Sequence, residues 1–500
     1  MTPSESILPY RHRLARCMGA LTLGLCLLAL AACKSHVDTM APFRQAWHNA
    51  EYDRADHEID ILIAGATGLS VQDLDESPAL SERLDTSAGN NVLYALEKGM
   101  TLLSKDELQP SATLWAHAQE YYDSKLGHDF MDGFTSIIGD DESRDYVGND
   151  YEHVMLRVME AFNELLRGGR QAFSHALAVD EVQTRIIESE YGTTMGDGER
   201  YYPRSGYKRF AIGSYLSGLL YEADIQAQEA NKRFQRALTW SRYKPQIIKD
   251  AIERTTKGEF APLGYGAVNI IYLAGRGPFY VEGTDQATQS AVNLAKFGIA
   301  LGGRSWAAAF QAPVPVPKVF ISDSRIQPLE VSAAGVAPIR TQLMTDVNII
   351  VAEQLKANMT GIMARAIVRR TAKAAAAAAV ERGVRSNNKN SDWAALLAGI
   401  FANVALTASE RAETRCWTSL PAQIQVGRLV LEDGVHDLEL SDGNKLRARV
   451  RRGANTWVLV IRPRLDLPSR VLLDVHSRVA PDVETTKKAE RSLSTNEAGK

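Results

Sequence analysis

Cysteine is scarce in this chain of 500 residues, which has only four, at positions 17, 26, 33 and 416. No CxxC pair occurs and the ten histidines are scattered, with no two at metal-ligand spacing, so no zinc or other metal site is indicated. An excess of one charge is also lacking, because 57 basic residues face 60 acidic ones. No basic stripe predicts a nucleic-acid partner. We therefore expect no metal, no cofactor and no nucleic acid.

The N-terminal segment has the three-part layout of an export signal. A basic region comes first, then an apolar stretch over residues 17–30, and then the small residues Ala31 and Ala32 before Cys33. The basic residues are Arg11, Arg13 and Arg16. The apolar stretch is too short and wrongly flanked to be a stable membrane span. The layout therefore predicts export across the inner membrane.

The run Leu30-Ala31-Ala32-Cys33 resembles the lipobox of bacterial lipoproteins, in which the cysteine sulfur carries a diacylglycerol and the new amine is acylated after cleavage. We predict a signal peptide over 1–32, lipidation at Cys33, and an acylated anchor and spacer over 33–40. In this class an Asp after the cysteine favours the inner membrane, so Lys34 points to the outer membrane. Cys416 would then be the remaining free thiol. The alternative is an ordinary secretory signal that is cut nearby.

Residues 41–257 have the spacing of helical hairpins that repeat. In two places a small residue early in one helix is followed by an aromatic residue and a small residue on the next helix, at matching offsets. The first set is Gly99, Leu102, Trp115 and Ala118, and the second is Gly218, Tyr221, Phe234 and Ala237, with Ala230 at the position of Ser111. This is the tetratricopeptide pattern, in which each helix pair needs a neighbour to bury its face. A looser unit lies over 151–188, and a generic α-bundle is the alternative.

The spacing of apolar residues changes in the second half of the chain, and the new spacing predicts strands on either side of a helical segment. We expect a first β segment, then a helical segment with a long helix over 345–382, then a C-terminal β module that forms a small antiparallel sandwich or barrel, then a disordered tail. These four ranges are 258–340, 341–412, 413–480 and 481–500. The fold class is therefore α+β: a tetratricopeptide-like α-solenoid followed by β-sandwich-like segments with an intervening long helix.

Three short motifs give the chain a wider resemblance. They are Tyr151-Glu152 at the start of a central helix, Gly277-Pro278, and Arg415-x-Trp417-x-x-Leu420-Pro421 before the last β module. With these motifs the chain resembles a family of Gram-negative outer-membrane lipoproteins of no established function, which have a tetratricopeptide-like N-terminal half. The family usually has Asp where Glu413 stands, and a Lys near Tyr280. The resemblance implies a role in envelope assembly rather than a reaction, and we expect the motif residues to be structural.

One stretch approximates the nucleophile elbow of a serine hydrolase, namely Gly303-Arg304-Ser305-Trp306-Ala307. Asp323, His436 and His476 follow it in the order that α/β-hydrolases use. The last glycine of the elbow is replaced by Ala307, and the surrounding sequence does not alternate between strand and helix. The sequence therefore favours a protein that is not an enzyme, with a serine hydrolase of envelope polymer or lipid as the alternative.

A third hypothesis is a lipid- or glycan-binding module. It would use either the basic side of the long helix or an aromatic loop that contains Tyr201 and Tyr202. The basic residues are Arg365, Arg369, Arg370 and Lys373, and a solvated face is the simpler interpretation of them. Arg415 and Trp417 are spaced to stack as a cation–π pair that would lock the helical segment to the β module.

The leading hypothesis is an outer-membrane lipoprotein, lipid-anchored through Cys33 and facing the periplasm. It would act as a scaffold or accessory factor that binds other envelope proteins or lipoproteins through its helical repeats. Acylation would hold the protein at the membrane and raise its local concentration near a partner.

Overall fold

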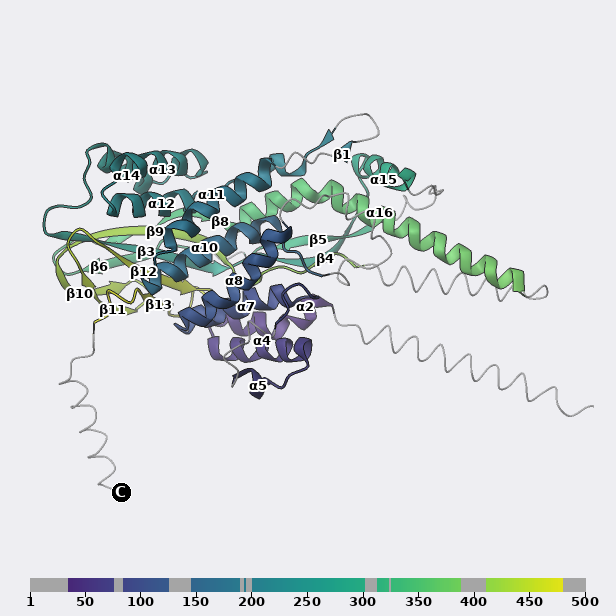
Figure 1. The fold of residues 1–500 in the computed structure, drawn as a ribbon, viewed down its shortest axis with the longest axis horizontal. Helices are drawn as coiled ribbons and strands as arrows, with labels where there is room; N and C mark the ends of the chain where they lie inside the picture. The colour runs from purple at the N-terminus through teal and green to yellow at the C-terminus, as the bar shows by residue number, and fades with distance from the viewer. Residues whose placement is uncertain are drawn as a thin grey trace, which may run out of the picture.

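The fold was obtained as a computed structural model that describes residues 35–75, 84–125, 145–188, 193–194, 200–301, 313–322, 325–387 and 411–479. Helices and several sheets are both present, so the predicted α+β class is confirmed (Figure 1). Several predictions lie outside these ranges: the signal peptide over 1–32, Cys33, the elbow around Ser305 with Asp323, and the tail over 481–500.

The first half of the chain is a series of helices that pack in sequence order from α3 to α14, except that the short α5 and the next helix, α7, both pack against α4. Their bounds are α2 His36–Thr39, α3 Ala41–His48, α4 Tyr52–Thr67, α5 Val71–Asp75, α7 Asn91–Ser104, α8 Leu108–Lys125, α10 Asp150–Arg167, α11 Ala172–Glu188, α12 Ile212–Ala223, α13 Ala227–Trp240 and α14 Gln246–Thr256. Two short strands, β1 Thr193–Thr194 and β2 Arg200–Tyr201, and the 3-10 helix η2 Pro203–Gly206 lie between α11 and α12.

The predicted spacer over 33–40 is wrong for the residues that the structure describes there. Ser35 caps α2 through a capping box with Asp38, and Met40 is fully buried. The reason is that Met40 and His36 pack into the helical core, which outweighs the polar character of the neighbouring residues. The folded body therefore begins within two residues of Cys33.

Two helix pairs meet through a glycine that lies under an aromatic ring. A Cβ atom placed on Gly99 of α7 would lie 2.6 Å from Cδ1 of Trp115 on α8, and one placed on Gly218 of α12 would lie 2.6 Å from Cε1 of Phe234 on α13. Both rings are fully buried. The residues that follow on the same offsets, Ala118, Ala230 and Ala237, are also fully buried, while Tyr221 is half-buried and packs edge-on against Phe173. The helices approach closely because these positions have no or small side chains.

Two sheets lie beneath the helices. The larger has the strand order β13-β12-β3-β9-β8 and the smaller β11-β10-β6-β7. The bounds are β3 Tyr265–Arg276, β6 Glu330–Ala333, β7 Ile339–Arg340, β8 Gln342–Asp346, β9 Pro421–Glu432, β10 Gly434–Leu440, β11 Lys445–Val450, β12 Asn455–Arg462 and β13 Arg470–Leu473. Only the β12–β3 pair within these two sheets is parallel.

The expectation that residues 413–480 close into a separate antiparallel module is therefore wrong. Strand β3, from the predicted first β segment, lies between β9 and β12, and β6 pairs with β10. The interior of β3 is buried on both faces, which is typical of a central strand that needs neighbours on both sides. Strands from 258–340 and from 413–480 thus form a single sandwich.

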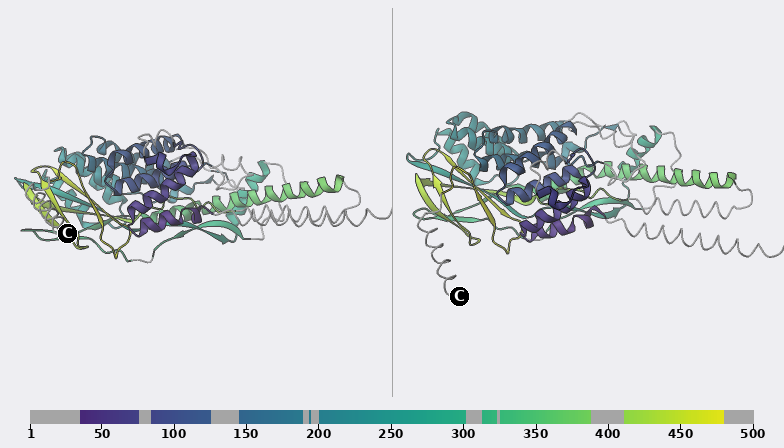
Figure 2. Two further views of the ribbon diagram at one scale, coloured as in Figure 1. Left: turned by 90° about the horizontal axis from the view of Figure 1, so that it is seen from below. Right: turned by 60° about the horizontal axis from the view of Figure 1, so that its bottom comes forward.

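The β3 strand divides its side chains between two cores. Val268 and Ile270 pack with Leu438 and Val450 between the two sheets. Ile271 and Leu273 point the other way and join the core shared with the helices. The body is therefore built of three layers, helices on one sheet and that sheet on the second, and Figures 1 and 2 show the helices covering one face.

An arm extends from one end of the body (Figures 1 and 2). It consists of β4 Phe279–Asp285, α15 Gln289–Leu301, β5 Val314–Phe320 and α16 Val347–Asn387, and it has a small core of its own. The predicted long helix over 345–382 is confirmed by α16. Its predicted basic side is not solvated throughout, because Arg369 is buried and Arg370 donates to the carbonyl of Pro313 at 2.9 Å. Within the described ranges no helix combines the length and the apolar character that crossing a bilayer requires.

Candidate functional site

The predicted motif residues meet at a buried junction between the helices and the sheet. The stretch over 412–421 runs through it and leads into β9, and Trp417, Cys416 and Leu420 are each at most 1% exposed. We call this stretch, with the groups that bind it, the junction. The three motifs are far apart in the sequence, and the fold brings them together at the junction.

Two buried carboxyl groups hold the junction from the helical side. Glu152 on α10 accepts the backbone N–H of Trp417 at 2.8 Å. Glu97 on α7 accepts the backbone N–H and the hydroxyl of Thr418, at 2.6 and 2.7 Å, and both the N–H and the hydroxyl of Ser419. The segment has no strand partner here, so these side chains satisfy backbone groups that would otherwise be unpaired.

Glu152 also lies in the first turn of its own helix, α10, which begins at Asp150. It forms a capping box with Asn149, and it accepts the hydroxyl of Tyr146 at 2.6 Å and that of Tyr122 at 3.3 Å. The preceding residue, Tyr151, is 1% exposed. The Tyr151-Glu152 motif is therefore a helix start whose carboxylate reaches across to the junction.

The Gly277-Pro278 motif lies on the opposite side of the same segment. A Cβ atom on Gly277 would overlap the carbonyl of Leu420, and the neighbouring residues Arg276 and Pro421 are register partners in the sheet. Both Gly277 and Pro278 are buried. Glycine is required because the two backbones approach too closely for a side chain.

The predicted cation–π pair of Arg415 and Trp417 is wrong. The guanidinium of Arg415 lies 5.2 Å from the ring centroid of Tyr146 and is bonded to Glu413 and Asn90. Trp417 instead packs edge-on against Trp115, with ring centroids 6.2 Å apart. Arg415 therefore packs on Tyr146 and Trp417 packs on Trp115, so the two side chains do not stack on each other.

Burial shifts the pKa values of titratable side chains at the junction. It raises the pKa of Glu97 to about 7, although the donors from Thr418 and Ser419 oppose the rise. It also raises the pKa of Cys416, whose sulfur accepts the backbone N–H of Tyr280 at 3.4 Å, and that of Tyr146. The role of Glu97 could not be predicted from the sequence, because nothing near this residue in the chain shows that its hydrogen-bond donors are Thr418 and Ser419. The junction is buried, and its polar groups bind one another and the backbone of residues 417–419.

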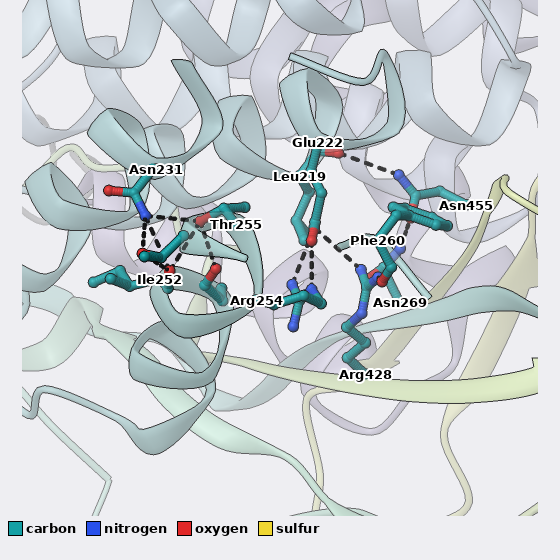
Figure 3. A network of polar contacts seen from close by, with 12 residues as sticks. Leu219, Glu222, Asn231, Ile252, Arg254, Thr255, Phe260, Asn269, Arg428 and Asn455 are labelled. Atoms are coloured by element: carbon teal, nitrogen blue, oxygen red, sulfur yellow. Dashed lines mark hydrogen bonds and ion pairs between the residues drawn. The ribbon is translucent and has the colours of Figure 1, made fainter. Parts of the chain in front are cut away.

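An open pocket of about 650 Å³ lies elsewhere, between α14, the loop 259–262 and strands β7 and β9. Figure 3 shows the polar network at its base. Glu222 of α12 forms a bidentate ion pair with Arg254, and Nη1 of Arg428 lies 3.5 Å from the same carboxylate. Arg428 also donates to the carbonyl of Phe260 at 2.9 Å and lies over its ring.

This triad has two guanidinium groups and one carboxylate, so it carries one excess positive charge. Burial lowers the pKa of Arg428 to about 10, and its Nε has no hydrogen-bond partner. The mouth of the pocket has the exposed carboxylates Asp250 and Glu259, which oppose the entry of an anion. The arrangement therefore fastens α12 and α14 to β9 and supplies no nucleophile.

The residues of the hydrolase alternative are only partly described. Nε2 of His436 on β10 is 2.8 Å from the carbonyl of Glu432, while the ring of His476 packs against Gly168 at the end of α10. Of the aromatic loop, Tyr202 is exposed. In the ranges that the structure covers, no group of three or more His, Cys, Asp or Glu side chains is arranged to hold a metal ion.

Comparison with known protein families, with curated proteins and with solved structures gave no match. The resemblance to the lipoprotein family therefore rests on the motif residues and stays a prediction.

Proposed function

We propose that this chain is an outer-membrane lipoprotein that faces the periplasm and acts as a scaffold or accessory factor for other envelope proteins. Its anchor would be the acylated Cys33. The observation that carries the proposal is the short distance in sequence from that residue to the folded body, since α2 begins at His36 and packs into the core. A body that begins so few residues after its anchor is confined to the membrane surface, which raises its concentration near partners on that surface.

The helix pairs α7–α8, α10–α11 and α12–α13 are, in this proposal, tetratricopeptide-like repeats. The support is their packing in sequence order and the glycine under an aromatic ring in two of the three pairs. Every residue of α7 is buried, with α4 and α8 as its neighbours, and nearly every residue of α10 is buried, with α8, α11 and β12 as its neighbours. A partner therefore binds the outer helices α8, α11 and α13 rather than the inner groove that such repeats often offer.

Site-specific photo-crosslinking in intact cells tests this surface. The probe replaces Glu120 on α8 or Lys232 on α13, both exposed, and the control probe replaces Lys445 on β11, which is equally exposed but lies on the other sheet. We expect the two helical positions to capture the same envelope protein, and the capture to be lost in Cys33→Ala. Capture from Lys445 alone, or capture that persists in Cys33→Ala, would contradict the proposal.

Ser305→Ala separates the scaffold from the hydrolase alternative. The scaffold proposal expects crosslinking and cell growth to be unchanged by this substitution. Loss of function with an intact fold, judged by circular dichroism, would favour the hydrolase.

A further inference from the structure

Two half-buried arginines, one from α3 and one from β3, flank one aromatic ring, and within the described ranges neither forms an ion pair. The guanidinium carbons of Arg44 on α3 and Arg276 on β3 lie 4.5 and 4.9 Å from the ring centroid of Phe279. Across the part of the chain that the structure covers, neither forms an ion pair, and Nε of Arg276 has no hydrogen-bond partner. The carboxyl groups of Asp38 and Glu97 act on Arg44 without forming an ion pair with it, and no acidic group among the described residues acts on Arg276 in the same way. Two neighbouring cations that are not paired with a carboxylate attract an anion from outside the chain.

Exposed apolar side chains continue this feature outward. Phe320, at the end of β5, packs against Phe279 with the ring planes tilted by 34° and the ring centroids 4.7 Å apart. The guanidinium of Arg276 lies 5.1 Å from the centroid of Phe320. Phe320 and the next residue, Ile321, are each 39% exposed. We call Arg44, Arg276, Phe320 and Ile321 the anchor-side patch.

The contacts place this patch beside the first helix. Arg44 donates to the carbonyl of Val37 in α2 at 3.2 Å, so α2, Arg44, Phe279 and Phe320 form a continuous chain of contacts. Figures 1 and 2 agree in showing the β4–β5 ribbon alongside the N-terminal helices. Cys33 is two residues from Ser35, a span of at most about 7 Å.

We propose that the anchor-side patch binds the anionic headgroups of the bilayer next to the acylated cysteine. This inference rests on the proposed lipid anchor for its place at the membrane. Arginine and aromatic side chains are the groups that favour the boundary between headgroups and water, and an aliphatic neighbour adds buried apolar area. The patch gives the body a second contact beside its anchor, so the orientation of the scaffold at the membrane is fixed.

Vesicle co-sedimentation of the full mature chain with Cys33→Ala tests the patch without the acyl group. We expect binding to phosphatidylglycerol vesicles that weakens as salt is added, and little binding to phosphatidylcholine vesicles. Arg44→Gln with Arg276→Gln should lower the partition coefficient roughly thirty-fold, since each basic residue near an anionic surface contributes about five-fold. The matched control, Lys257→Gln with Lys445→Gln, removes two exposed cations elsewhere and should change binding little.

Ile321→Ser provides a second test that keeps both arginines. It should also weaken binding, whereas Val435→Ser, at a residue of the same 39% exposure on β10, should not. Thermal unfolding monitors the fold of each variant, and Ile321→Ser carries the test if the arginine variant does not fold. Equal binding to both vesicle types, no binding to either, or unchanged binding in Ile321→Ser would overturn the proposal.

These experiments distinguish a failure of the patch proposal from a failure of the lipid-anchor proposal. Vesicle binding is measured on protein that lacks Cys33, so its loss says nothing about acylation, which the mass of the N-terminal peptide reports. If the patch variants bind vesicles normally but lose a crosslinked protein partner, the patch is a protein-docking surface and the lipid proposal is wrong.

Discussion

Replacing Gly99 by Ala tests how closely α7 and α8 must approach. The new methyl group would overlap the indole of Trp115, which is fully buried and donates Nε1–H to the carbonyl of Leu96 at 3.3 Å. Overpacking of this kind costs about 1 to 3 kcal/mol. If the ring moves, its N–H loses its partner for a further cost of roughly 1 to 3 kcal/mol. Alanine recovers about 1 kcal/mol of helix propensity, so the net destabilisation with both costs should be about 1 to 5 kcal/mol.

Gly65→Ala is the matched control, because a Cβ atom at Gly65 in the exposed face of α4 meets nothing within 4 Å. The same chemical change should there stabilise the protein by about 0.5 to 1 kcal/mol. Urea unfolding followed by tryptophan fluorescence measures both free energies. Adding Trp115→Phe to Gly99→Ala should recover part of the loss. Equal stability of Gly99→Ala and the parent chain would refute the close-packing account.

Three further predictions concern buried groups. Glu222→Gln leaves the buried guanidinium of Arg428 and the partly buried one of Arg254 without a carboxylate, and should cost about 3 to 5 kcal/mol in urea unfolding. Glu253→Gln, at a side chain that is 69% exposed, should change stability by less than about 0.5 kcal/mol. Because the folded-state pKa of Glu97 lies above its ordinary value, the folded chain keeps the extra proton between pH 4.5 and about 7. The free energy of unfolding should therefore fall by about 3 kcal/mol as the pH rises through that window, relative to Glu97→Gln, and a difference that does not vary with pH would contradict the shift. In the Cys33→Ala protein the thiol of Cys416 should react with a maleimide only at the rate at which the junction opens. The reason is that Cys416 is 1% exposed and that burial raises its pKa. Rapid labelling of the native protein would show that the junction is open.

The parts of the fold that could be predicted are those marked by a local pattern in the sequence. The glycine and aromatic positions on α7, α8, α12 and α13 follow from helix periodicity, and α16 follows from a long run with high helix propensity. Each of these signals lies within a stretch of sequence that the element itself occupies.

Pairings between distant segments could not be predicted. The parallel register of β12 with β3 joins residues about two hundred positions apart, and nothing in either strand specifies the other. Glu97 likewise has no local partner, because its donors come from Thr418 and Ser419. The motifs around Glu152, Gly277 and Trp417 were visible, but only their meeting at the junction explains them.

The most direct test of the lipid-anchored account is the mass of the N-terminal peptide from protein extracted from the outer-membrane fraction. The account predicts a peptide that begins at Cys33 and carries a thioether-linked diacylglycerol and an acylated amine. An N-terminus at another residue, or an unmodified Cys33 in protein released with the soluble periplasmic fraction, would contradict it.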